Sequence, residues 1–555
     1  MKISGADLIV KLIERQNITT IAGIPGGANL PLYDALSKSS IKHILARHEQ
    51  GGGFIAQGMA RSTGKPSVCF ATSGPGVTNL VTAIADANMD SVPVIAITGQ
   101  TPLPLIGTDA FQEVDTYGLF LPITKHNFLV RSAKELLTVI PEAFKVAVSG
   151  RPGPVLIDIP KDVQLEIIEI DELPEIGQKT ISPIADINKI LEAAEMINSS
   201  KKPVLYIGGG IVNSNCCGMI KDLSEKSSIP VTSTLMGLGA YNSKSELYLG
   251  MLGMHGAKHT NIVVDQSDLL IAVGVRFDDR ATGKIEDFCN HANIIHIDID
   301  YSEIDKIRES NCGIKGDACE VLKILLPLID ESKRTNWIKT ITNVKDENPV
   351  MDYDDLDIFY PGKLIYETGI AAGKNVIVTT DVGQHQMWTA QSYPFSRPGQ
   401  FLTSGGLGTM GFGLPTAIGA ALANPDKKII CFSGDGSILM NIQELATLSE
   451  QNLNVKIIIL NNGHLGLVRQ QQELFYNENY MASKFECRPD FSKIAEGFGI
   501  NSFKLNNCVS PIEALQEIMK AEGPTLIEVD IDPNENVYPM VPPGAANIEM
   551  ITEGA

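Results

Sequence analysis

The stretch that most constrains the fold spans residues 428–464 and alternates strand-like and helix-like patterns. A β-rich run that begins KIICFSG ends at the turn Gly434-Asp435-Gly436-Ser437. A helical segment with spaced apolar residues follows, and a second β-rich run over 455–460 ends at Asn462. Since such crossovers are right-handed, the pattern predicts parallel strands that bring Asp435 and Asn462 to the same carboxyl edge of a sheet.

Open α/β sheets bind their ligands at that edge. A carboxylate and an amide oxygen, beside glycines that expose N–H groups at a helix start, suit a hard divalent cation carrying a diphosphate. Taken alone, GDG is typical of a tight turn and NN of a loop. Their pairing at the ends of two successive strands favours a magnesium site.

The GDGS turn followed by NN at this spacing resembles the signature of thiamine-diphosphate (ThDP) enzymes. In that family the Asp, the second Asn and a backbone carbonyl two residues later hold Mg²⁺. The resemblance implies Asp435, Asn462 and the carbonyl of His464 as metal ligands. It also implies ThDP contacts at Gly434, Gly436 and Ser437.

The whole chain alternates strand and helix patterns, which predicts an α/β fold with three doubly wound parallel-sheet domains. We expect an N-terminal pyrimidine-binding domain over 1–163, a central FAD-binding domain over 186–345 and a diphosphate-binding domain with a tail over 359–555. The acidic, proline-punctuated segment 164–185 is predicted to be a linker, and 330–358 a second linker or a covering helix.

A short strand ends at Arg47-His48-Glu49-Gln50, directly before a helix rich in glycine and alanine. A glutamate at a helix start is usually explained by the helix dipole. In ThDP enzymes a carboxyl group hydrogen-bonded to the pyrimidine ring favours the imino tautomer, whose exocyclic nitrogen then removes the C2 proton of the thiazolium. The resemblance assigns this role to Glu49.

Three segments of the first domain, GTDAFQE (107–113), TKH (124–126) and SGRPGPVLIDIPKDVQ (149–164), occur in the order found in acetohydroxyacid synthase, also called acetolactate synthase. Packing and turns would explain each segment alone. The resemblance to this family implies that Phe111, Gln112 and Lys161 border the substrate channel. It also implies that Gly27 and its neighbours face the reacting centre and that Arg151 touches a flavin.

In the central domain, a triple glycine follows the strand PVLYI, but GxGxxG is missing, which disfavours a nicotinamide dehydrogenase. The RFDDR segment (276–280) is either a surface ion-pair cluster or, by resemblance, a flavin contact through Arg276, Asp278 and Arg280. The resemblance also implies that Arg276 helps to recognise the second 2-oxoacid. Its guanidinium group can bind a carboxylate through two parallel hydrogen bonds. The other implied FAD contacts are Gly208, Gly209, Gly210, Thr234, Leu235, Met236, Leu252, Gly253, Met254, His255, Gly274, Asp298, Ile299, Asp300, Gly316 and Asp317.

The third domain has a turn whose backbone amides suit a diphosphate, at Val382, Gly383, Gln384 and His385. The glycine-rich segment 404–423 then leads into an alanine-rich helix, a pattern that close helix packing would also explain. By resemblance, Met410 wedges between the two rings of the cofactor and Gly408 accepts from its exocyclic amine.

The implied reaction is decarboxylation of pyruvate and transfer of the hydroxyethyl unit to a second 2-oxoacid. Pyruvate as acceptor gives 2-acetolactate, towards valine and leucine, and 2-oxobutyrate gives 2-aceto-2-hydroxybutyrate, towards isoleucine. FAD is expected to be structural. A pyruvate oxidase with redox-active FAD and an inert regulatory homologue are the alternatives.

One position departs from the family. Most biosynthetic members carry a tryptophan where this chain has Gln471, and that tryptophan packs the extra methyl of the acceptor. We therefore expect weak preference for 2-oxobutyrate, resembling the bacterial isozyme I type of catalytic subunit.

The net charge of −20 argues against a nucleic-acid partner. No apolar run of about 18 residues and no signal-peptide pattern occurs, and the nine cysteines are scattered, so we expect a cytoplasmic protein without membrane contact. The resemblance implies a homodimer or larger assembly, in which Glu49 of one chain serves the cofactor held by Asp435 of another. It also implies a small regulatory subunit.

Overall fold

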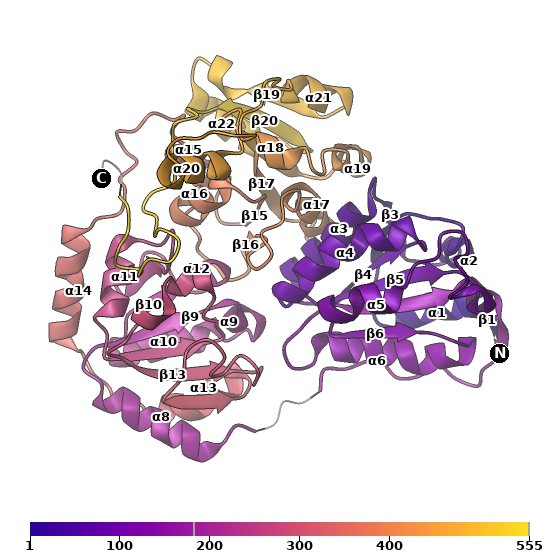
Figure 1. Cartoon of the computed structure of the whole chain (residues 1–555), viewed down its shortest axis with the longest axis horizontal. Helices are drawn as coiled ribbons and strands as arrows, with labels where there is room; N and C mark the ends of the chain where they lie inside the picture. The colour runs from indigo at the N-terminus through magenta and orange to yellow at the C-terminus, as the bar shows by residue number, and fades with distance from the viewer. Residues whose placement is uncertain (181–183, 553–555) are drawn as a thin grey trace.

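The computed structural model describes residues 1–180 and 184–552, and this part of the chain forms three lobes, each built on a six-stranded parallel sheet (Figure 1). The first sheet has the order β3-β2-β4-β5-β7-β6. Its strands are β2 (Thr20–Gly23), β3 (Lys42–Leu45), β4 (Ser67–Ala71), β5 (Val94–Gln100), β6 (His126–Leu129) and β7 (Val155–Pro160). Its helices are α1 (Gly5–Arg15), α2 (Leu30–Leu36), α3 (Glu49–Thr63), α4 (Pro75–Met89), α5 (Thr116–Phe120), α6 (Leu136–Val148) and α7 (Lys161–Leu165).

The central sheet has the order β11-β10-β9-β12-β13-β14. Its strands are β9 (Pro203–Ile207), β10 (Val231–Ser233), β11 (Tyr248–Met251), β12 (Leu269–Val273), β13 (Asn293–Asp298) and β14 (Cys312–Lys315). The helices of this lobe are α8 (Ile187–Ser199), α9 (Gly209–Asn213), α10 (Cys217–Ser227), α11 (Lys258–Asp265), α12 (Asp279–Thr282), α13 (Ala318–Leu325) and α14 (Thr335–Glu347).

The third sheet has the order β16-β15-β17-β18-β20-β19. Its strands are β15 (Val376–Thr380), β16 (Phe401–Leu402), β17 (Lys428–Gly434), β18 (Val455–Asn461), β19 (Asn501–Lys504) and β20 (Thr525–Asp530). Its helices are α15 (Pro361–Ala372), α16 (Gln384–Ser392), α17 (Gly413–Ala423), α18 (Asp435–Ile438), α19 (Glu444–Gln451), α20 (Gly466–Phe475), α21 (Phe491–Gly497) and α22 (Pro511–Lys520).

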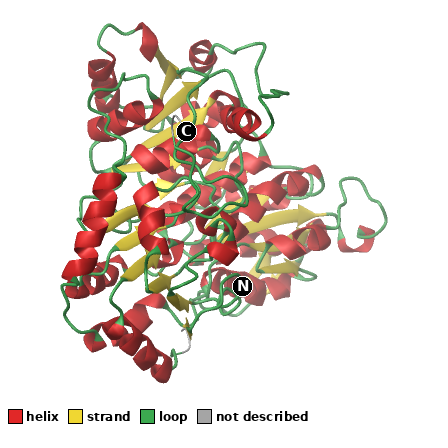
Figure 2. Ribbon diagram, turned by 60° about the vertical axis from the view of Figure 1, so that its left-hand side comes forward, coloured by secondary structure: helices red, strands yellow, loops and turns green. Residues whose placement is uncertain are grey.

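The central strands of each sheet are continuous apolar runs because helices cover both faces (Figure 2). Every residue of β4, β5, β12 and β18 is buried. The predicted fold class, three parallel α/β units, is therefore confirmed. The domain boundaries at 163, 186, 345 and 359 stay predictions.

The structure differs from the first predicted linker and, in the second predicted segment, has the covering helix that was one of the two alternatives. The segment 164–185 starts with the end of α7 and then contains a strand, β8 (Ile167–Glu169), which pairs antiparallel with β1 (Lys2–Ser4). Its residues 181–183 lie outside the described residues. Within 330–358, α14 is a covering helix whose buried Trp337 donates from Nε1 to the carbonyl of Pro203 at 3.1 Å. The predicted helix after GDGS is divided into α18 and α19.

The first and third lobes meet along α3 and α17, which start beside two of the predicted site segments. A Cβ on Gly58 of α3 would lie 2.1 Å from the carbonyl oxygen of Thr416, and one on Gly419 of α17 would lie 1.9 Å from that of Ile55. Both glycines are needed for this close approach. Helix packing therefore accounts for part of the glycine content of both segments.

None of the helices in the described part of the chain combines the length and the apolar character that a bilayer crossing needs.

Candidate active site

The predicted metal ligands come together at the carboxyl edge of the third sheet. β17 and β18 pair in parallel with Gly434 opposite Leu460, so Asp435 and Asn462 leave neighbouring strands. Burial raises the pKa of Asp435 to about 6, and the backbone N–H of Gly463, which hydrogen-bonds to this carboxylate, opposes that rise. A buried carboxylate beside an amide is a fitting place for a divalent cation, whose charge would favour the ionised form.

The side chain of Asn462 is held in one orientation by hydrogen bonds on both sides. Its Oδ1 accepts from the backbone N–H of His464 at 3.0 Å, and its Nδ2 donates to Oε1 of Gln384 at 3.2 Å. The second contact joins the turn after β18 to the turn after β15. The predicted diphosphate segment and the predicted metal segment are therefore adjacent.

His385 lies over the GDGS turn. A Cβ on Gly434 would lie 3.0 Å from Nδ1 of His385, so the imidazole rests against the bare backbone. The ring is buried, burial lowers its pKa to about 3, and its Nε2 has no partner among the described residues. A buried polar atom without a partner is expected where a bound group supplies one, so this position fits a phosphorylated cofactor.

Around the same turn, Ser437 Oγ accepts from the N–H of Gly434 at 3.1 Å. Gly383 has φ 151°, which only glycine adopts readily. Gly408 (φ 71°) lies beside it, since a Cβ there would be 4.0 Å from Cγ1 of Val382. Met410 is half-buried two residues further on. The loop after β16 thus reaches the turns that follow β15 and β17.

Glu49 is the first residue of α3 and is buried in the first lobe, where its Oε2 accepts from Nδ2 of Asn79 at 2.9 Å. The N-cap of α3 is His48, whose Nδ1 accepts from the N–H of Gln50 at 3.1 Å. The carboxylate of Glu49 is therefore not used as the cap. Capping alone does not explain its position.

The other predicted catalytic residues of the first lobe follow the carboxyl ends of its strands, and we find no hydrogen bond between them and Glu49 in the described residues. Gly27 follows β2 and has no atom within 4 Å of the place a Cβ would occupy. Phe111 and Gln112 follow β5; the Phe111 side chain is 87% exposed and Gln112 has φ 58°. Lys161 follows β7 and opens α7.

Within the described residues of one chain, no hydrogen bond or ion pair joins Glu49 to Asp435 or Asn462. The start of α3 instead contacts Glu444 of α19, whose Oε1 accepts from the N–H groups of Arg47 at 2.9 Å and His48 at 3.1 Å. Within the described residues, Glu444 rather than either predicted metal ligand therefore contacts the start of α3.

The predicted FAD residues lie at the carboxyl edge of the central sheet, after β9 to β14. His255 is buried, burial lowers its pKa to about 4, and its Nδ1 has no partner in the described residues, which fits a bound group. Close backbone packing already explains Gly208 and Gly210, because a Cβ on either would lie within 2.6 Å of Gly274. The triple glycine alone therefore does not require a dinucleotide. Segments placed at this edge also include Thr234, Leu235, Met236, Leu252, Gly253, Met254, Asp298, Ile299 and Gly316.

Several charged residues of this group have protein partners. Arg151 of the first lobe pairs with the central lobe, 2.6 Å from Glu303 and 3.4 Å from Asp300. Asp278 and Asp317 are side-chain N-caps of α12 and α13. The exposed Arg280 lies 3.5 Å from Asp279. The partners of the two aspartates give each a structural role alongside the predicted one.

Arg276 extends from the central lobe to the first lobe, where its Nη1 donates to the carbonyl oxygen of Met89 at 2.5 Å. Met89 is the last residue of α4, and a cation is favoured at that end of a helix. The side chain also lies next to the third lobe, because a Cβ on Gly406 would be 3.3 Å from Arg276 Nη2. Arg276 is therefore at a junction of all three lobes.

Sequence reasoning missed several residues around the site. Arg488 donates to the carbonyl oxygen of Asn462 at 3.3 Å, and Gln470 accepts from Nε2 of Gln384 at 3.1 Å. Glu444 is fully buried against α3. None of them belongs to a local motif, and Glu444 opens a helix, ELATLSEQ, that carries other polar residues, so nothing in the sequence signals its burial.

Comparison with known proteins agrees with this geometry. Residues 3–119 match the family "Thiamine pyrophosphate enzyme, N-terminal TPP binding domain", 190–325 its central domain and 381–529 its C-terminal TPP binding domain. The three matched segments correspond to the three sheets. Fold and site together define a thiamine pyrophosphate enzyme.

Similar proteins show to which family of thiamine pyrophosphate enzymes the chain belongs. The chain is 56% identical to the "Acetolactate synthase isozyme 1 large subunit" of Escherichia coli, over 100% of this chain and 98% of that protein. It is 46% identical to the isozyme 2 large subunit of the same organism, over 99% of each chain. It is also 46% identical to the acetolactate synthase large subunit of Porphyra purpurea, over 99% of this chain and 95% of that protein. The chain belongs to the family of acetolactate synthase large subunits.

Proposed function

We propose that this protein decarboxylates pyruvate and joins the remaining two-carbon unit to a second 2-oxoacid, which gives 2-acetolactate or 2-aceto-2-hydroxybutyrate. The observation that supports it most directly is the adjacency of Asp435, Asn462 and Gln384 at one sheet edge. Family membership over the full chain supports the same reaction. Bound ThDP would supply the nucleophilic carbon and the electron sink for decarboxylation.

In this proposal Asp435, Asn462 and the His464 carbonyl would hold Mg²⁺, whose charge would help to bind the diphosphate. The hydrogen bonds on either side of Asn462 orient its oxygen before the metal arrives, so little side-chain entropy is lost on binding. The buried His385, whose Nε2 has no partner among the described residues, lies against the backbone of Gly434, and this supports a phosphate group beside the turn.

Glu49 is assigned the proton-handling role at the pyrimidine. Its burial strengthens a hydrogen bond to a ring nitrogen, and Asn79 orients the carboxyl group. The Gly408 carbonyl is assigned as acceptor for the exocyclic amine and Met410 as the side chain that separates the two rings.

Arg276 is assigned the recognition of the acceptor 2-oxoacid, because its guanidinium group can bind the carboxylate with two hydrogen bonds. Phe111, Gln112 and Lys161 are assigned to the channel, and Gly27 to the face of the reacting centre. The nearly complete exposure of Phe111 supports a place at an entrance rather than in a core.

The proposal extends to FAD in a structural role at the central sheet edge. The buried, partnerless Nδ1 of His255 supports it. Arg151, Arg276 and Arg280 would face the anionic part of the group. A pyruvate oxidase would instead reduce its flavin during turnover.

We also propose that two copies of the chain complete each site, with Glu49 from one and Asp435 from the other. Membership of the family supports this arrangement, and in the described residues of one copy no hydrogen bond or ion pair joins the two side chains. The names of the relatives, which call them large subunits, support a small-subunit partner. All nine cysteines are free, which is consistent with a reducing cytoplasm.

Product analysis tests the central proposal. Purified protein with ThDP, Mg²⁺ and FAD is expected to convert pyruvate alone into 2-acetolactate, and with added 2-oxobutyrate to form both products. The Glu49→Gln variant should bind ThDP but lose about 100-fold or more in turnover. Acetate and a reduced flavin as products would replace the proposal with the oxidase reaction, and no pyruvate consumption would favour an inert homologue.

A further inference from the structure

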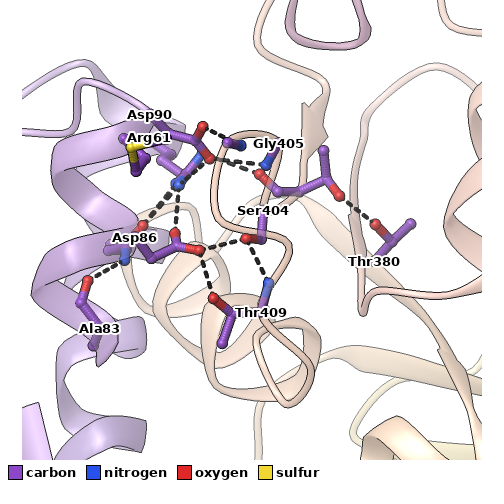
Figure 3. A network of polar contacts seen from close by, with 12 residues as sticks. Arg61, Ala83, Asp86, Asp90, Thr380, Ser404, Gly405 and Thr409 are labelled. Atoms are coloured by element: carbon purple, nitrogen blue, oxygen red, sulfur yellow. Dashed lines mark hydrogen bonds and ion pairs between the residues drawn. The ribbon is translucent and has the colours of Figure 1, made fainter. Parts of the chain in front are cut away.

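A buried cluster of charges joins the first lobe to the loop that carries Gly408 and Met410. Arg61 of α3 lies 3.0 Å from Oδ1 of Asp86 and 2.9 Å from Oδ2 of Asp90, with both aspartate side chains fully buried (Figure 3). Its Nη1 also donates to the carbonyl oxygen of Thr403 at 3.1 Å. One guanidinium thus serves two carboxylates, and buried charges of this kind need complete hydrogen bonding.

The two aspartates contact the loop in chemically different ways. In the described residues, the donors to Asp90 are groups that can never accept a hydrogen bond. They are the backbone N–H of Gly405 at 2.9 Å, that of Gly406 at 2.8 Å, and Arg61. Asp86 Oδ2 accepts from two hydroxyl groups, those of Ser404 and Thr409. A hydroxyl group can either donate or accept, whereas a backbone N–H can only donate.

The same loop lies next to Arg276. Asp90 directly follows Met89, whose carbonyl accepts from Arg276, and a Cβ on Gly406 would be 3.0 Å from Oδ1 of Asp90 and 3.3 Å from Nη2 of Arg276. Gly408 is two residues beyond Gly406. Asp90 therefore lies between Arg276, the residue proposed to recognise the acceptor, and the loop that carries Gly408 and Met410, the residues proposed to face the cofactor.

We propose that Asp90 is a positioning residue: by holding the N–H groups of Gly405 and Gly406, it sets Gly408 and Met410 against the cofactor and Arg276 beside them. The inference rests on the roles given to these residues in the proposed function. Asp86 holds the same loop through the hydroxyl groups of Ser404 and Thr409, which can reverse their hydrogen bonds when the carboxylate is replaced by an amide. Burial raises the pKa of Asp86, and the charge of Arg61 opposes that rise.

The donor pattern provides a matched pair of variants. In Asp90→Asn, the amide NH₂ of the new side chain must face a backbone N–H or Arg61. Two hydrogen-bond donors are then buried against each other without an acceptor. Asp86→Asn makes the same change in charge and shape, but its NH₂ can donate to the Ser404 or Thr409 hydroxyl. Asp86 lies in the last turn of α4 and Asp90 is the C-cap of the same helix, and both belong to one cluster, so the main difference between the two variants is the hydrogen-bond direction.

The test uses the FAD-loaded protein. Binding of ThDP with Mg²⁺ is measured by calorimetry, and the exchange of the C2 proton of bound ThDP for deuterium is measured by NMR after acid quench, with no pyruvate present. We expect Asp90→Asn to weaken ThDP binding or slow the exchange by about 10-fold or more, the cost of an unsatisfied buried charge partner. Asp86→Asn should stay within about 3-fold of the wild type.

Wild-type binding and exchange in Asp90→Asn, or equal losses in both variants, would overturn the proposal. If Asp90→Asn does not fold, Gly406→Ala decides: its Cβ would lie 2.9 Å from Met89 Cβ and 3.0 Å from Asp90, so it displaces the loop without removing a charge. Slow exchange in that variant supports the proposal, and wild-type exchange overturns it. A wild type that binds ThDP and exchanges C2 but forms no acetolactate would refute the proposed function alone.

Discussion

The carboxylate of Glu444 in α19 accepts the backbone N–H of His48 at 3.1 Å, one residue before Glu49, although the two residues are 396 positions apart. Oε2 of the same side chain accepts from the hydroxyl of Thr447 at 2.7 Å. The third lobe thus holds the start of the helix that presents the proposed catalytic carboxyl group.

Gly51→Ala is expected to disturb this contact. A Cβ on Gly51 would lie 2.3 Å from Oε1 of Glu444, so the carboxylate must move and release the N–H groups that it holds. A displacement of Glu49 by about 1 Å would lower turnover by about 10- to 100-fold. Steady-state assays of 2-acetolactate formation measure this effect.

Gly218→Ala is the matched control, because its Cβ would meet no atom within 4 Å. Its turnover should equal that of the wild type. Full activity in Gly51→Ala would mean that the Glu444 contact does not set the position of Glu49.

Gln470 of α20 accepts from Gln384, which contacts Asn462, and so links the proposed metal site to the C-terminal segment. Gln470 Oε1 accepts from the N–H of Val537 at 2.9 Å, and its Nε2 donates to the carbonyl of Val537 at 3.0 Å. Gln470→Ala removes both bonds, so hydrogen exchange at the Val537 amide should accelerate by about 10-fold or more. Exchange mass spectrometry on the segment 535–541 measures it.

Gln471→Ala, one position along on the exposed side of α20, should leave that exchange unchanged. If Gln470→Ala also leaves it unchanged, other contacts hold the segment, such as the bond from Val541 N–H to the carbonyl of Met254 at 2.9 Å.

Much of the fold could be predicted because the buried strands are continuous apolar runs that end in glycine-rich turns. The prediction that the strands before Asp435 and Asn462 are parallel is confirmed, since it needed only the right-handed crossover rule. Short edge strands such as β6 and β16 were missed. They carry few residues, and their pairing is decided by the neighbouring strand rather than by local propensity.

The contacts between lobes could not be predicted. Nothing local pairs Gly58 with Thr416, or Asp90 with Gly405, because each contact depends on how two separately folded units pack. Buried charged residues such as Arg61 and Glu444 look like ordinary surface helix residues in the sequence. The roles given to the site residues therefore stay predictions, although the structure places their segments at three sheet edges.

The acceptor preference can be tested at Gln471, where the family usually has tryptophan. Gln471→Trp should raise the preference for 2-oxobutyrate over pyruvate by about 10- to 200-fold, the usual worth of one apolar methylene contact. Competition of the two acceptors, with both products quantified, gives the ratio. Gln472→Trp adds the same ring about 100° around the helix and should leave the ratio unchanged. A wild type that already strongly prefers 2-oxobutyrate would refute the interpretation of Gln471.

Asp158 makes the stability of the first lobe depend on pH. It is buried in β7, where it accepts from Thr98 Oγ1 at 2.7 Å and from Gln100 Nε2 at 3.0 Å, and burial raises its pKa to about 7. The folded state therefore binds a proton between about pH 4 and 7 that the unfolded state has released. In that window stability falls as pH rises, by about 1.4 kcal/mol per unit.

Asp158→Asn removes this titration. The Tm of the variant minus that of the wild type, measured by calorimetry, should therefore be more positive at pH 8 than at pH 5, whatever its sign at either pH. Asp171→Asn, an exposed aspartate of the segment after β8, should give the same difference at both pH values. An Asp158→Asn difference that does not change with pH would mean that Asp158 stays ionised in the folded protein, with its hydrogen bonds offsetting the cost of burial.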